Sequence, residues 1–126
     1  MDNENNIRCK EIANVAFGQL FWSIDKWTYF SWGVMKKAYL MYKNMPTLAL
    51  RCSALIHKGW VYISLDESTD TYVITLLNTA KEVVRTQEDV YCDCLGEIID
   101  GMIEKPVELT DEKYKELAMQ DSLNKL

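Results

Sequence analysis

Apolar residues recur with a helical period near the start of the chain, over residues 8–22. An i, i+3, i+4, i+8 spacing places side chains on one face of a helix. The residues of this face are Ile12, Val15, Ala16 and Leu20, with Phe17, Phe21 and Ile24 at its sides. After Asp25 the helical period is lost, and residues 27–32 are ring-rich and β-prone. A short strand is expected at Tyr39–Tyr42.

The next pattern has the period of two that is typical of strands. Residues 47–57 alternate between two sets of side chains, and residues 60–65 alternate again after Lys58-Gly59. A two-residue turn at Lys58-Gly59 would pair Ile56 with Val61 in a β-hairpin. That register gathers one set of small and apolar side chains on a single face, which we expect to be the core face: Cys52, Ala54, Ile56, Val61, Ile63 and Leu65.

Two more strands and a helix are expected after this hairpin. Residues 66–70 form an acidic turn that leads to a strand at 72–76, and residues 78–80 form a turn that leads to a strand at 83–84. From about 89 to 104 the helical period returns. The apolar stripe of this helix is Tyr91, Leu95, Ile98, Ile99, Met102 and Ile103. Its opposite side carries an acidic stripe of Asp93, Glu97, Asp100 and Glu104.

Together these segments predict an α+β fold. We expect a four- to five-stranded antiparallel meander sheet flanked by an N-terminal and a C-terminal amphipathic helix. Pro106 ends the second helix, so residues 1–106 are expected to form one domain. Residues 107–126 are expected to form a short helical tail, capped by Thr110, that packs on this domain or extends from it.

Length and composition limit the class of protein. The chain has 126 residues and a mass of 14.7 kDa, which suits one domain, and its 48% hydrophobic content is ordinary for a globular protein. No apolar run reaches the roughly 18 residues of a membrane-spanning helix. Residues 1–6 lack the features of a signal peptide. We therefore expect a cytoplasmic protein that does not contact membranes.

The four cysteines and the single histidine predict neither a metal site nor a cofactor. Cys92 and Cys94 are too close for the Cys-x-x-Cys spacing of a redox pair or a zinc knuckle. A tetrahedral zinc site needs about four nitrogen or sulfur ligands, and His57 is the only imidazole. Reduced, partly buried thiols are the expected state.

Positive charge and aromatic rings concentrate in the first half of an acidic chain. The formal net charge is −5, yet residues 26–65 contain six lysine or arginine residues and no carboxylate. Nine of the fourteen aromatic residues lie between Phe17 and Tyr42. Single-stranded nucleic acids bind to such mixtures of cations and rings. Composition alone favours the other interpretation, in which the rings form core and the lysines lie at its rim. The residues of the candidate nucleic-acid patch are Lys26, Trp27, Lys36, Lys37 and Lys43.

The predicted hairpin leaves a second sheet face that is too apolar to stand in water. This face carries Arg51, Leu55, His57, Trp60 and Tyr62. Three coverings are open: the N-terminal helix with the aromatic segment around residues 27–32, a second copy of the chain, or a ligand. Our leading hypothesis is a non-enzymatic interaction module that associates with itself or with a protein partner through this face.

No catalytic motif supports an enzyme or an evident small-molecule substrate. The five glycines are scattered singly, so no phosphate-binding loop is expected. His57 lacks a nearby carboxylate in the sequence and is expected at the surface. The turn at residues 66–70 lacks the glycine and glutamate of a calcium loop. The acidic stripe is expected to be solvated, with a basic partner or the basic segment 26–65 as alternative contacts.

A winged-helix DNA-binding protein is a further alternative. Pro46 suits the first position of a helix and Gly59 suits its end, so residues 47–57 also fit a helical interpretation. Residues 60–77 would then form the wing. The second alternating run favours the hairpin over this helix.

Overall fold

All five strands lie in chain order in a single antiparallel sheet. The computed structural model describes residues 2–104, with side chains from residue 7 onward. The strands are β1 (Val34–Tyr42), β2 (Met45–Ser53), β3 (Lys58–Asp66), β4 (Thr71–Leu77) and β5 (Val83–Val90). The helices are α1 (Asp2–Leu20), α2 (Lys26–Ser31) and α3 (Leu95–Ile103), with a 3₁₀ turn at Cys92–Cys94 before α3. The expected α+β fold with an antiparallel meander is confirmed, and the expected tail at 107–126 lies outside the described residues.

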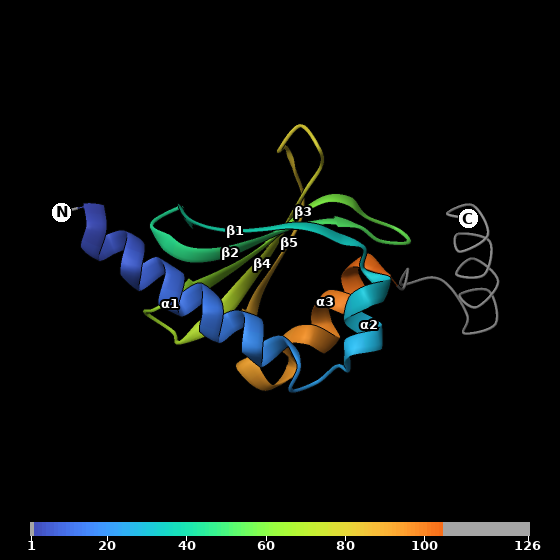
Figure 1. Cartoon of the computed structure of the whole chain (residues 1–126), viewed down its shortest axis with the longest axis horizontal. Helices are drawn as coiled ribbons and strands as arrows, with labels where there is room; N and C mark the ends of the chain where they lie inside the picture. The colour runs from blue at the N-terminus through green and yellow to red at the C-terminus, as the bar shows by residue number, and fades with distance from the viewer. Residues whose placement is uncertain (1, 105–126) are drawn as a thin grey trace.

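The helices of the described chain lie on one face of the sheet (Figure 1). The main core lies between them and the sheet. The turn between β4 and β5 projects away on the opposite side (Figure 1). The larger side chains of this core that are fully buried include Leu20, Trp32, Leu50, Ile63, Ile74, Leu95, Ile99 and Ile103. Burying such side chains stabilises the fold by about 1.5–3 kcal/mol for each aliphatic one.

Helix α1 buries a stripe that is rotated from the predicted one. The buried residues are Cys9, Ala13, Ala16 and Leu20, which keep the i, i+4 and i+3 spacing of one face. Val15, placed on the stripe by the sequence pattern, is instead exposed. At the end of this stripe α1 comes close to α3, because Gly96 has no side chain: a Cβ atom there would lie 2.2 Å from the Leu20 carbonyl oxygen.

The predicted β2–β3 hairpin exists, but its register is different. Val61 pairs with Leu50 and not with Ile56. The cause is the turn: the Ala54 N–H donates to the His57 carbonyl at 3.0 Å, so β2 ends at Ser53 and a four-residue connection replaces the expected two-residue turn. The register changes by an even number of residues, so Cys52, Ala54, Val61 and Ile63 still lie in the main core. Ile56 belongs to the connection and is exposed.

The ring-rich segment after Asp25 is a helix, which corrects the expected β-structure. The Asp25 Oδ1 atom accepts a 2.8 Å hydrogen bond from the Thr28 N–H and thereby caps the start of α2. This contact also lowers the pKa of the Asp25 carboxyl. Capping by a short polar side chain therefore outweighs the weak β-propensity of the rings that follow.

The C-terminal helix begins later than its period suggested. Residues 83–90 belong to β5, and α3 begins only at Leu95. Tyr91, expected on the apolar stripe, precedes the helix and is exposed. Four members of the stripe are buried as expected: Leu95, Ile99, Met102 and Ile103.

Candidate interaction surfaces

The sheet face that the sequence singled out is closed by its own side chains. Trp60 is 8% exposed, Tyr62 and His57 are also buried, Leu55 is half-buried, and only Arg51 is exposed. Trp60 and Tyr62 form a second, smaller cluster with side chains from the other strands: Ala38, Leu40, Tyr42, Ala49 and Leu77. The N-terminal helix and the aromatic segment, one of the three coverings considered, pack in the main core on the other face of the sheet.

Ring contacts explain how a face without a helix excludes water. Tyr42 lies edge-on to Tyr62 with a centroid distance of 5.1 Å, and Trp60 lies 6.2 Å from Tyr62. The Lys81 Nζ atom lies 5.4 Å from the Trp60 ring centroid, so its side chain reaches back over the ring. Burial raises the pKa of the Tyr62 hydroxyl above its ordinary value.

His57 is a structural residue of the β2–β3 connection and not the expected surface histidine. Its side chain is buried, and its Nε2 atom lies 3.0 Å from the Trp60 carbonyl oxygen. A donor at Nε2 satisfies that carbonyl and holds the turn against the start of β3. This role differs from that of a catalytic base.

The aromatic segment, in contrast, leaves large rings in contact with solvent. Trp22 is 63% exposed, Trp27 is 70% exposed and Phe30 is 63% exposed. Trp27 contacts Phe30 at 6.0 Å between ring centroids, and Phe21 joins this group through Tyr29. We call Phe21, Trp22, Trp27 and Phe30 the aromatic surface. Phe21 and Trp22 lie in the turn that follows α1, and Trp27 and Phe30 lie on α2.

Sequence reasoning selected Trp27 but missed Trp22 and Phe30 as exposed residues. The signal was the capping carboxylate of Asp25, which predicts a short helix directly after it. A six-residue helix built from Lys26-Trp27-Thr28-Tyr29-Phe30-Ser31 presents rings on several sides. It cannot bury all of them against one core.

The predicted nucleic-acid patch is only partly assembled. Lys26 lies over Trp27, 5.4 Å from its centroid, and Lys37 lies 4.0 Å from the Phe17 ring centroid. Lys36 is the next residue on β1 and therefore points to the other side of the sheet, where its strand partner is Arg51. Lys43, at the far end of β1, contacts its own neighbour Tyr42 and does not join the group.

The acidic stripe is divided between solvent and protein contacts. Asp93 and Glu97 are exposed as expected, whereas Glu104 is buried. Asp100 is half-buried and accepts a hydrogen bond from the Trp32 indole. Within residues 7–104, Arg8 forms an ion pair with Glu67, which is not part of this stripe.

The described residues form no obvious centre for metal or thiol chemistry. Among residues 7–104, no group of three or more histidine, cysteine or acidic side chains is placed to hold a metal ion. Burial, with a smaller contribution from the Glu104 carboxylate, raises the pKa of the Cys52 thiol to about 12. Such a thiol is protonated and unreactive at neutral pH.

Comparison with known proteins adds no family to this description. No protein-family model, curated protein or solved structure matches the chain. Of the helices within residues 2–104, none combines the length and apolar character needed to cross a membrane.

Proposed function

We propose that this chain is a non-enzymatic interaction module that self-associates through the aromatic surface. The observation that carries the proposal is the exposure of more than 60% of the Trp22, Trp27 and Phe30 side chains in adjoining segments. Monomeric proteins rarely leave contiguous large apolar groups in water. Tryptophan residues are also enriched among those that dominate binding energy in protein interfaces. The proposal moves the contact from the sheet face to the end of α1 and α2.

Charge around the aromatic surface supports a second copy as the partner. Lys26 lies over Trp27, and Lys37 lies over Phe17 at the base of the same ring group. On the neighbouring α3, the Glu97 backbone N–H donates to Ser23 Oγ at 3.0 Å. The backbone of Glu97 therefore lies beside the residue that follows Trp22, and the Glu97 side chain is exposed. A two-fold interface places a surface against itself. Lysines of one copy can then meet carboxylates of the other.

Sedimentation velocity over a range of concentrations tests the proposal. We expect a concentration-dependent dimer for the natural chain and a dissociation constant at least about tenfold higher for Trp27→Ser/Phe30→Ser. The matched control is Val83→Ser/Val84→Ser, which removes two exposed apolar side chains from β5. Circular dichroism verifies that each variant folds. A natural chain that stays monomeric at all concentrations contradicts self-association, and dimer loss in the control would assign the contact to β5.

Single-stranded nucleic acid binding is the second candidate function. It is favoured by the Lys26 ammonium over the exposed Trp27 ring and by the absence of carboxylates from residue 26 to 65. It ranks second because Glu97 adds negative charge beside the same rings.

A tryptophan-fluorescence titration with mixed-sequence single-stranded DNA and RNA separates the two functions. Quenching that weakens as salt rises supports nucleic acid binding, because phosphate contacts release counterions. The Trp27→Phe variant would reduce this quenching more than Trp60→Phe, whose ring is buried. Absence of quenching at low salt contradicts this second function.

A further inference from the structure

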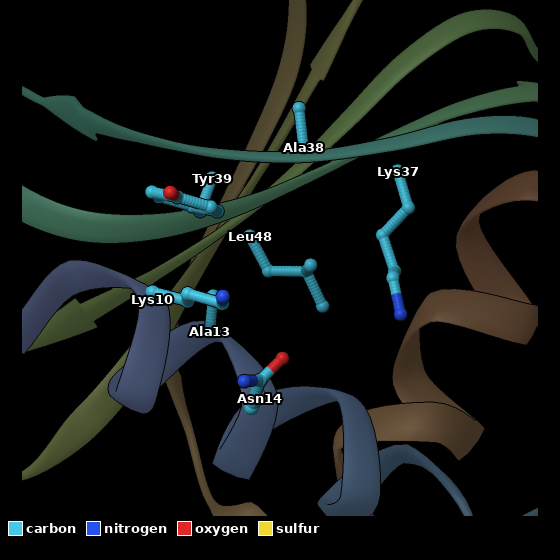
Figure 2. Close-up of a pocket in the computed structure, with 7 residues that line it drawn as sticks. All are labelled: Lys10, Ala13, Asn14, Lys37, Ala38, Tyr39 and Leu48. Atoms are coloured by element: carbon cyan, nitrogen blue, oxygen red, sulfur yellow. The ribbon is translucent and has the colours of Figure 1, made fainter. Parts of the chain in front are cut away.

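A cavity of about 270 Å³ lies between helix α1 and the edge strand β1. None of its lining residues belongs to the aromatic surface, although Lys37 also contacts Phe17, which packs against Phe21 of that surface. Its lining residues are Lys10, Ala13, Asn14, Lys37, Ala38, Tyr39 and Leu48 (Figure 2). Helix α1 supplies one wall, β1 supplies the other, and Leu48 of β2 forms the floor between them.

The cavity combines an apolar floor with cationic walls. Ala13 and Leu48 are buried, whereas Lys10 and Lys37 are exposed. Figure 2 shows the Lys10 and Lys37 side chains on either side of Leu48, with the Asn14 carboxamide on the helix below it. No aspartate or glutamate is among the lining residues. Two ammonium groups thus face an apolar space without a carboxylate of the cavity to neutralise them.

A contact outside the cavity holds Lys37 in position. Its Nζ atom lies 4.0 Å from the centroid of the Phe17 ring, a cation–π contact between β1 and α1. The contact keeps the ammonium at the cavity edge, although it does not neutralise its charge. A ligand therefore meets a cation whose conformational freedom is already reduced, which lowers the entropic cost of binding.

We infer that this cavity binds a small amphipathic organic anion, a monocarboxylate with an aliphatic body. The body lies on Leu48 and Ala13, and the carboxylate lies between the lysine ammonium groups. The volume equals that of about nine water molecules at roughly 30 Å³ each. A carboxylate with about ten non-hydrogen atoms, such as octanoate, matches this space. For a ligand of this size, a dissociation constant on the order of a millimolar is expected.

Titration of the ¹⁵N-labelled full chain with sodium octanoate, followed by NMR, tests the inference. We expect saturable shifts of the Ala13, Ala38 and Leu48 amide signals. Octan-1-ol has the same body without the charge, and we expect it to bind at least about fivefold more weakly. Equal binding of octanol would overturn the inference, as would the absence of saturable shifts with octanoate.

Variants of single lysines complete the test. Lys37→Gln and Lys10→Gln are each expected to weaken octanoate binding at least about fivefold, because each removes one ammonium. The matched control is Lys36→Gln, since Lys36 neighbours Lys37 on β1 but points to the other face of the sheet. Equal weakening by Lys36→Gln would reduce the effect to net charge and overturn the inference. The NMR spectrum of each variant also reports whether it is folded.

Discussion

The indole nitrogen of Trp32 donates a 2.9 Å hydrogen bond to Oδ1 of Asp100, across 68 positions of sequence. Trp32 follows α2 directly and is fully buried, and Asp100 lies on α3. A buried indole N–H requires an acceptor. Asp100, which the sequence assigned to a solvated stripe, therefore connects α3 to the residue that follows α2.

Asp100→Ala is expected to lower the free energy of unfolding by about 1–3 kcal/mol, because the Trp32 N–H would remain buried without this acceptor. Urea unfolding followed by circular dichroism measures the change. Asp93→Ala is the control, since Asp93 is exposed and acidic but lies in the 3₁₀ turn before α3. Its effect should stay within about 0.5 kcal/mol. Equal effects of the two substitutions would contradict the assigned role of Asp100.

The same substitution at two glycines of α3 is expected to have opposite signs. A Cβ atom at Gly96 would lie 2.2 Å from the Leu20 carbonyl oxygen, so Gly96→Ala must push α3 away from α1 and cost about 1–3 kcal/mol or more. A Cβ atom at Gly101 meets no atom within 4 Å. Gly101→Ala should therefore stabilise the helix by about 0.5–1 kcal/mol.

Thermal and urea unfolding of both glycine variants checks this prediction. A stabilised Gly96→Ala protein would show that α1 and α3 are not in the close contact described. A destabilised Gly101→Ala protein would show that this position is covered.

Thiol labelling should divide the four cysteines into two classes. Burial raises the pKa of Cys52 to about 12, so almost none of it is thiolate at pH 8. Cys9 is also buried, and its Sγ donates to the Leu40 carbonyl at 3.1 Å. Iodoacetamide followed by mass spectrometry should modify the half-buried Cys92 and Cys94 first. Denatured protein, in which all four thiols react, is the reference, and early modification of Cys52 would contradict the described core.

Alkaline pH should destabilise the protein partly through Tyr72. Burial raises the pKa of its hydroxyl to about 12, and the hydroxyl donates to Gln19 Oε1 at 2.5 Å. The unfolded chain loses this proton near pH 10, before the folded protein does. Unfolding is therefore favoured as pH rises from 10 towards 12, and the contribution of Tyr72 is fully present below pH 10.

Urea midpoints at pH 9, 10 and 11 measure this dependence. The Tyr72→Phe variant should be less stable at pH 9 but should lose less stability between pH 10 and 11 than the natural chain. Parallel losses in the two proteins would show that Tyr72 does not titrate as described. The remaining decline in the variant reports other buried acids, including Cys52.

The period of the strands predicted the faces of the sheet, whereas the register depended on a turn that the period does not encode. Alternation continues through His57 although β2 ends at Ser53. Gly59 resembled a turn glycine, but it lies within β3, where a Cβ atom would be 2.3 Å from the Leu77 carbonyl oxygen. Local sequence gave no sign of this approach by a strand eighteen positions later.

The candidate surface was even less accessible to sequence reasoning, because exposure depends on the arrangement of elements. The sequence placed Trp60 on an apolar face that needed a cover, and side chains of the strands themselves supplied that cover. Trp22 and Trp27 lie within ten positions of Trp32 in the sequence, yet of these three tryptophans only Trp32 enters the core. Composition alone could not distinguish them.

The last described helix also determines when the core is completed during synthesis. Each strand pairs with the one before it, so the meander can grow as the chain leaves the ribosome. The helix-facing side of that sheet cannot close until Leu95, Ile99 and Ile103 arrive, because all three are fully buried beneath it. A nascent chain that has finished β5 has α1 available to cover part of this face, but the part that α3 covers is still exposed. This is the interval in which aggregation or chaperone capture competes with folding.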